Sequence, residues 1–253
     1  MSVLAPVIGP LRQGLGLLLD GLLPPLCLHC AAAADRPGSL CASCWAQVRF
    51  IGPPQCTACG LPFEFDPGGS DALCGACSRE RPPYRQARSA FVYEGVGRSL
   101  VLGFKLSDRT YAAPAFAAWM ARSGAPSIES VELIVPVPLS RRQLFLRRFN
   151  QAALLAQALG RCTGRPVAPD LLVRTRTTAR QSSLSASERA RNVRGAFAVR
   201  RGREERLAGK AVLLIDDVLT TGATAAACAT ALFAAGAREV DVLTLARTVR
   251  ATP

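Results

Sequence analysis

Four Cys-x-x-Cys pairs open the chain, and their spacing is typical of metal sites. Ten residues separate the first two pairs, and fourteen separate the last two. Two residues between cysteines let one tight turn direct both sulfurs at one ion, so two turns supply the four thiolates of a closed zinc shell. The sequence therefore predicts two structural zinc ions. Their ligands are Cys27, Cys30, Cys41 and Cys44 at the first site, and Cys56, Cys59, Cys74 and Cys77 at the second.

Disulfides, a redox-active pair and an iron–sulfur cluster are the alternatives for these cysteines. No signal peptide is evident, so we expect a reducing, cytoplasmic compartment in which disulfides are rare. Four pairs exceed what thiol exchange needs. Residues 27–80 contain only about ten large apolar side chains, too few to hold such a segment together without a metal. Zinc is therefore favoured, in a module that scaffolds or binds, because a closed shell has no open catalytic position.

A second group of chemically suited residues follows the apolar run Val212–Ile215. Asp216 and Asp217 come directly after it, and adjacent carboxylates at a strand end can accept hydrogen bonds from a vicinal diol or hold Mg²⁺. The next turn offers hydroxyls, a glycine backbone and a helix N-terminus, which suit a phosphate. Its residues are Thr220, Thr221, Gly222, Ala223 and Thr224. A diol beside a phosphate describes ribose 5-phosphate, and the plainer alternative is a strand–turn–helix connection with solvated acids.

Short apolar runs alternate with helical patterns from residue 86 onward. This alternation predicts an α/β domain with a mainly parallel sheet, which binds ligands at the carboxyl ends of its strands. We expect an amphipathic segment over 1–26, a double zinc ribbon over 27–80 and the α/β domain over 86–250. Predicted strands are Ser89–Tyr93, Val131–Val137, Leu171–Val173, Ala196–Val199, Val212–Ile215 and Val240–Leu245, and predicted helices include Gln151–Leu159 and Ala223–Ala235.

Charge is unevenly distributed along the 253 residues, which carry 31 Lys+Arg and 18 Asp+Glu for a net charge of +13. Lys105 and Lys210 are the only lysines, so nearly all the positive charge is arginine. Residues 140–206 alone carry sixteen arginines and four acids. This balance indicates polyanionic partners. The 49% hydrophobic content excludes a disordered chain, and no run of about 20 apolar residues predicts a transmembrane segment.

Residues 212–224 resemble the thirteen-residue signature of type I phosphoribosyltransferases. The resemblance implies that Asp216 and Asp217 hold the ribose hydroxyls of Mg²⁺-bound phosphoribosyl pyrophosphate (PRPP), and that the next loop holds its 5′-phosphate. The segment Ile134–Leu139 is similar to the strand and pyrophosphate loop of the same fold, which gives that role to Pro136, Val137 and Pro138. The flexible loop that closes over pyrophosphate would then contain Arg174, Arg176 and Arg180.

The order of these motifs over residues 22–248 resembles the ComF family of competence proteins. One departure is Lys105-Leu106-Ser107-Asp108, where the family often carries Lys-Tyr-His-Gly. The resemblance implies a type I phosphoribosyltransferase-like α/β fold and a role in DNA uptake, with single-stranded DNA and a helicase or recombination mediator as partners. The expected nucleic-acid contacts are Arg141, Arg142, Arg147 and Arg148. The alternatives are an active phosphoribosyltransferase with an unidentified acceptor and a basic surface that is merely solvated.

Overall fold

The computed structural model describes residues 25–69, 71–106, 109–176 and 186–249, and its chain forms two compact units, Met1–Gln47 and Val48–Pro253. The amphipathic segment predicted over 1–26 lies almost entirely outside the described residues. In the first unit, helix α2 (Ala42–Ala46) begins directly after Cys41. The second unit contains the other helices and strands described below.

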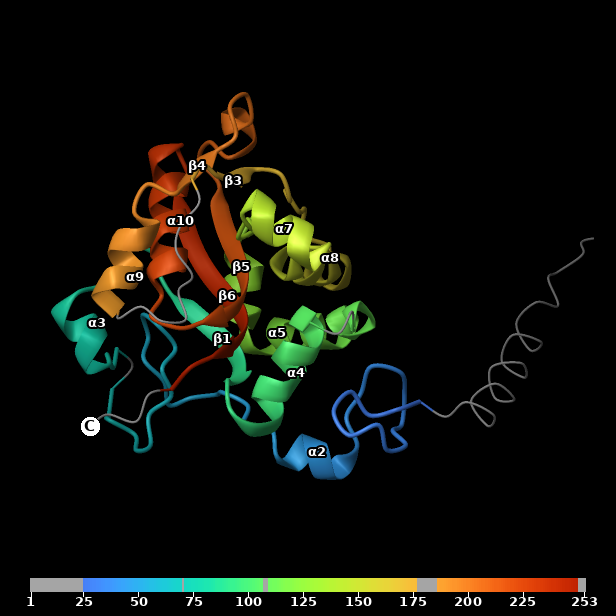
Figure 1. Cartoon of the computed structure of the whole chain (residues 1–253). Helices are drawn as coiled ribbons and strands as arrows, with labels where there is room; N and C mark the ends of the chain where they lie inside the picture. The colour runs from blue at the N-terminus through green and yellow to red at the C-terminus, as the bar shows by residue number, and fades with distance from the viewer. Residues whose placement is uncertain (1–24, 70, 107–108, 177–185, 250–253) are drawn as a thin grey trace, which may run out of the picture. The chain divides into compact units, whose positions relative to one another are not determined.

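A parallel four-stranded sheet forms the centre of the second unit (Figure 1). Its strand order is β1-β6-β5-β2, and all three pairings are parallel. The strands are β1 (Ala87–Val92), β2 (Leu133–Pro136), β5 (Ala211–Leu219) and β6 (Glu239–Arg247). The parallel sheet predicted from the alternating pattern is therefore confirmed.

Helices cover both faces of this sheet (Figure 1). On one face α10 (Ala223–Ala234) packs against β5 and β6, with α9 (Ala186–Val193) beside it. The other face carries α4 (Gly95–Leu106), together with α5 (Ala113–Ser123) and α8 (Gln151–Thr163), which pack against each other. The shorter elements are α3 (Gly75–Arg79), α6 (Ala125–Ser130), α7 (Arg141–Arg147), and the 3-10 turns η1 (Thr110–Ala112) and η3 (Glu204–Arg206).

Two of the six predicted strands lie outside the main sheet, and β5 is more than twice its predicted length. The strands β3 (Leu172–Arg174) and β4 (Phe197–Val199) pair with each other in antiparallel register. Strand β5 continues past its apolar run through Asp216 and Asp217, because β6 runs beside it and supplies backbone partners as far as Arg247. The two acids therefore lie inside the strand, near its carboxyl end, and not after it.

The chain before β1 covers the free edge of that strand. The Ile51 N–H donates to the Ala90 carbonyl at 2.9 Å, and the Val92 N–H donates to the Arg49 carbonyl at 2.9 Å. The rings of Phe50 and Phe91 meet edge to face with centroids 6.2 Å apart. An uncovered edge would expose a row of backbone donors and acceptors. The segment that leads into the second cysteine quartet is thus part of the same unit as the sheet.

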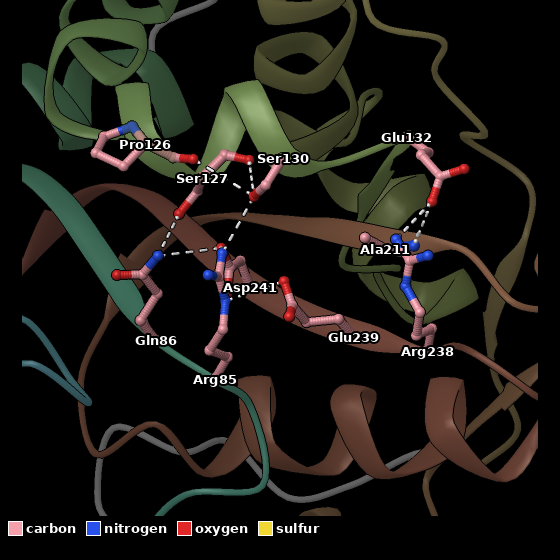
Figure 2. A network of polar contacts seen from close by, with 10 residues as sticks. All are labelled: Arg85, Gln86, Pro126, Ser127, Ser130, Glu132, Ala211, Arg238, Glu239 and Asp241. Carbon is pink, nitrogen blue, oxygen red and sulfur yellow. Dashed lines mark hydrogen bonds and ion pairs between the residues drawn. The ribbon is translucent and has the colours of Figure 1, made fainter.

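A buried carboxylate ties together the amino-terminal ends of β1 and β6 (Figure 2). The side chain of Asp241 is fully buried, and Arg85 donates two hydrogen bonds to it, one from Nε at 2.9 Å and one from Nη2. The Gln86 amide donates to Asp241 at 3.3 Å and to the Ser127 hydroxyl of α6 at 3.0 Å. This network lies at the opposite end of the strands from the predicted ligand site.

Replacing Arg85 with Ala should lower the free energy of unfolding by about 2 kcal/mol, because it leaves the buried Asp241 carboxylate without its charged partner. The cost stays below that of a fully buried pair, since the Arg85 side chain is 42% exposed. Urea unfolding midpoints measure the effect. The matched control is Arg238→Ala, whose pair with Glu132 is exposed and should contribute less than about 1 kcal/mol. Equal midpoints for the two variants would contradict the prediction.

Candidate functional site

An ion pair lies at the carboxyl end of β5, where the ligand was expected. The Lys105 Nζ, at the end of α4, is 3.0 Å from the Asp217 Oδ2, and both side chains are largely shielded from water. Shielding strengthens such a pair relative to one on the surface. The Asp216 Oδ1 accepts a hydrogen bond from the Asp217 backbone N–H at 2.8 Å. The two carboxylates are thus held differently, one by a cation and one by the backbone.

Burial raises the pKa of Asp216 to about 7, and the negative charge of Asp217 adds to the rise. The hydrogen bond from the Asp217 N–H and the charges of Lys105 and Arg147 act in the opposite direction. Adjacent carboxylates resist simultaneous ionisation, and removal from water increases that resistance. Asp216 therefore titrates near neutral pH, where a diol or a divalent cation would favour its ionised form.

The loop after the acids turns into α10 at Gly222, which has a φ of +80°. A Cβ at this position would lie 3.0 Å from the Tyr84 hydroxyl oxygen, so both the backbone conformation and the space favour glycine. Thr220 and Thr221 are exposed, and the Ala223 N–H donates to the Thr221 hydroxyl at 3.4 Å. The loop thus presents hydroxyls and the N-terminus of a twelve-residue helix at the same edge as the acids.

The segment Pro136–Pro138, predicted to bind pyrophosphate, lies beside β5. The Val137 N–H donates to the Ile215 carbonyl at 2.9 Å, directly before the acids. The Asn150 side chain donates to the Val137 carbonyl at 3.0 Å and accepts the Ala152 N–H at 3.0 Å, which caps α8. One side chain therefore fixes this segment to the start of α8, next to the predicted ribose site.

Helix α7 follows this segment and carries the predicted nucleic-acid arginines. Ser140 and Gln143 form a capping box at its start, which stabilises a helix of only seven residues. Phe145 is 87% exposed, and its neighbours Leu144 and Leu146 are exposed as well. The helix begins with Arg141 and Arg142. It ends at Arg147, and Arg148 follows it.

Two of the three arginines predicted for the pyrophosphate-closing loop are engaged by the fold. The Arg174 Nη1 donates to the Gln143 side chain at 3.4 Å, and its guanidinium lies 5.5 Å from the centre of the Phe197 ring. The Arg176 Nη2 donates to the Asn192 and Arg194 carbonyls at 3.3 and 2.7 Å. Arg180 lies outside the described residues. The cations that act on Asp216 are instead Lys105 and Arg147.

Sequence reasoning assigned no site role to Lys105, Gln151 or Tyr84. Gln151 is buried at the start of α8, where its amide accepts from the Arg147 Nη1 and donates to the Lys105 carbonyl, each at 3.3 Å. It thereby joins the ends of α4, α7 and α8 around the acids. Lys105 carries a usable signal, since it is one of only two lysines in an arginine-rich chain. Tyr84 carries none, because it precedes the first strand in a segment without a periodic pattern.

The eight cysteines assemble into the two predicted quartets. Within each quartet the sulfurs all lie within 4.8 Å of one another, and all ten cysteines are free of disulfides. The His29 and Cys74 N–H groups donate to the sulfurs of Cys27 and Cys56 at 3.5 and 3.3 Å. Burial raises thiol pKa values, but backbone hydrogen bonds lower the pKa of Cys27 to about 6 and that of Cys56 to about 7. Ligand type, number and spacing therefore fit tetrahedral zinc.

The two quartets are built alike. The Cys27 N–H donates to the Ala32 carbonyl at 2.7 Å, and the Cys56 N–H donates to the Leu61 carbonyl at 2.8 Å. The residue after the first pair has a positive φ in each quartet, +59° at Ala31 and +68° at Gly60. The second pair of each quartet begins at a short helix, α2 or α3. The repeated backbone pattern supports two equivalent metal sites.

Comparisons with known proteins agree with this description. A family model described as a double zinc ribbon domain matches residues 18–84. The DNA utilization protein YhgH of Salmonella typhi is 34% identical over 90% of this chain and 99% of its own length, and competence protein F of Haemophilus influenzae is 30% identical over 87% and 96%. The chain belongs to the ComF family. The structure confirms the predicted parallel α/β sheet of this ComF protein, and the family model and the two cysteine quartets confirm its predicted N-terminal double zinc ribbon.

Among solved structures, glutamine PRPP amidotransferase of B. subtilis aligns with 56% of this ComF chain and 30% of its own, at 21% identity and a TM-score of 0.39. Over the part of the chain that the structure describes, no helix combines the length and the hydropathy that crossing a membrane requires.

This ComF protein should contain two zinc ions per chain when purified without chelator, each in a four-thiolate site. Removing them under reducing conditions should unfold both cysteine quartets, because the metal supplies folding energy that so few apolar side chains cannot. Elemental analysis and circular dichroism before and after chelation provide the measurement. A zinc content near zero, or thiols blocked as disulfides under reducing conditions, would show the assignment to be wrong.

Proposed function

We propose that this protein binds Mg²⁺-PRPP or a similar phosphoribosyl ligand and acts on single-stranded DNA during DNA uptake in the cytoplasm. The assignment of this ligand rests on one observation: Asp216 and Asp217 lie beside Lys105 and the phosphate loop. Carboxylates accept hydrogen bonds from ribose hydroxyls and suit Mg²⁺, and a helix N-terminus suits the 5′-phosphate. Relatives named for competence and for DNA utilization support the role in DNA uptake.

Lys105 and Asp217 act as a pair in this proposal. Without a ligand, each neutralises the charge of the other across 3.0 Å. When the ribose hydroxyls donate to the carboxylates, Lys105 becomes available to donate to a pyrophosphate oxygen. Val137, held beside Ile215, adds a backbone segment at the same position. The Mg²⁺ ion would offset the negative charge of the pyrophosphate.

The DNA part of the proposal rests on helix α7. Proteins bind single strands with cations along the phosphate backbone and with aromatic faces on which bases stack. Phe145 is 87% exposed, and two arginines at each end of this short helix flank it in the sequence. A basic surface that is merely solvated gives no reason to expose Phe145 together with Leu144 and Leu146. A helicase or recombination mediator is the expected protein partner.

An active phosphoribosyltransferase is the second candidate, and the complete phosphate loop from Thr220 to Thr224 favours it. In that reaction a nucleophile displaces pyrophosphate from the anomeric carbon, so pyrophosphate release distinguishes turnover from binding alone.

Replacing Asp216 and Asp217 together with Ala should abolish PRPP binding and leave the fold intact, because the carboxylates contribute little to core packing. Isothermal titration with PRPP and Mg²⁺, with and without single-stranded DNA, measures binding. Circular dichroism of the double variant verifies the fold. If the folded double variant binds PRPP as tightly as the parent, the ribose assignment is wrong.

Affinity for PRPP should fall as the pH drops below about 7, by up to roughly ten-fold per pH unit, because the ligand needs the ionised form of Asp216 and its pKa lies near 7. Lys105→Met should move the midpoint upward, since the lysine charge lowers that pKa. Titrations between pH 6 and pH 8.5 test this. Asp216→Asn is the control that isolates the titration of the ligand's own phosphates. A wild-type profile with the same slope as Asp216→Asn would refute the prediction.

Single-strand affinity should fall with salt at a log–log slope of about −0.7 per phosphate neutralised. Arg148→Ala should flatten this slope by about 0.7, whereas Phe145→Ala should weaken binding by about 1–3 kcal/mol at every salt concentration and leave the slope unchanged. Fluorescence anisotropy with a labelled oligonucleotide measures both. Phe65→Ala removes another exposed ring and is the matched control. No binding at low salt would leave only a partner-mediated role in DNA uptake.

A further inference from the structure

The second cysteine quartet is attached to the sheet through its own metal-binding turn. Three successive carbonyls of this turn, those of Thr57, Ala58 and Cys59, accept hydrogen bonds from the sheet. The donors, in the same order, are Arg88 Nη1 at 3.0 Å, the Ala87 N–H at 2.8 Å, and Arg247 Nη1. Because the same turn carries the sulfurs of Cys56 and Cys59, the metal and the sheet bind one short stretch of backbone from two sides.

Arg247 is a buried cation that needs a counter-charge. It is the last residue of β6, its exposed fraction is 7%, and its Nε has no hydrogen-bond partner. Among the residues that the structure describes, no carboxylate forms an ion pair with it. Burying a charge without a partner costs several kcal/mol. A divalent ion with four thiolates carries net negative charge, and Cys59, whose carbonyl Arg247 contacts, is one of those ligands.

The same region supports the phosphate loop. Arg247 lies opposite Leu219 in the β5–β6 pairing, and the Thr248 N–H donates to the Leu219 carbonyl at 3.0 Å. Leu219 is the last residue of β5 before the loop. Where the loop ends, the buried Tyr84 places its hydroxyl oxygen 3.0 Å from the position that a Cβ on Gly222 would occupy. Both ends of the loop therefore rest on residues beside the second quartet.

We propose that the metal of the second quartet positions the phosphate loop: its tetrathiolate charge holds Arg247, and Arg247 and Tyr84 fix the two ends of the loop. The statement about the loop rests on the proposed PRPP site, whereas the pairing of Arg247 with the metal does not.

Zinc release tests the pairing directly. In a Cys30→Ser/Cys41→Ser background the first site is empty, so zinc passing to a chromogenic chelator comes from the second site alone. Arg247→Met should accelerate this release at least ten-fold, as expected when a partner outside the ligand shell is lost. Arg247→Lys, which keeps the charge, should restore most of the parent rate, and Arg238→Met should not change it. Equal release rates for Arg247→Met and its parent would overturn the pairing.

Ligand titration tests the loop in the same background. Arg247→Met should weaken PRPP binding about ten-fold. Tyr84→Phe, which removes only a hydroxyl, should weaken PRPP binding several-fold without changing zinc release. This variant still tests the positioning of the loop if Arg247→Met fails to fold. If folded Arg247→Met and Tyr84→Phe both bind PRPP as tightly as the parent, the metal site does not position the phosphate loop. If the parent itself does not bind PRPP, the proposed function fails, while the zinc-release rates still decide whether Arg247 pairs with the metal.

Discussion

Two adjacent carboxylates within a buried strand repel each other, and the surroundings of β5 compensate for that repulsion. Lys105 pairs with Asp217, the Asp217 N–H binds Asp216, and burial keeps the pKa of Asp216 near 7. The end of α4 must therefore reach β5, and Gln151 holds it there through the Lys105 carbonyl. A phosphoribosyl ligand would relieve the same repulsion with its hydroxyl donors, so the ligand-free site is arranged as the complement of what it is proposed to bind.

With zinc bound, the second cysteine quartet would concentrate negative charge in a similar way. Three carbonyls of its first turn accept hydrogen bonds from β1 and β6, so this ribbon is continuous with the sheet and closes the edge of β1. Hydrogen bonds thus join the metal-binding turn to the sheet within the second unit. Lys105, at the end of a helix, pairs with Asp217, and in the proposal Arg247, at the end of a strand, balances the tetrathiolate metal site. Under the proposal, a metal site without an open coordination position affects the ligand site through Arg247.

Local patterns made the metal sites and the sheet predictable. Each Cys-x-x-Cys pair places two metal ligands close together in the sequence, so the metal sites can be recognised from local spacing. The alternation of apolar runs with helical patterns indicates a parallel sheet. The length of β5 was not predictable, because Asp216 and Asp217 interrupt its apolar run while the backbone pairing with β6 continues past them. The ion pair of Lys105 with Asp217 and the approach of Tyr84 to Gly222 join residues far apart in the sequence. Such contacts depend on packing, which a periodic pattern does not encode.

The arginines of the second unit fall into two groups according to the contacts that the fold gives them. Arg174 and Arg176 make hydrogen bonds within the fold, and those bonds would have to break before either could reach a pyrophosphate. Lys105 and Arg147 already act on the carboxylate centre, so a single diphosphate has cations available without the loop. Arg148 lies instead beside an exposed helix that also presents Phe145. A cation placed next to an exposed ring, outside the carboxylate centre, matches an extended polyanion with stacking bases better than it matches one small ligand.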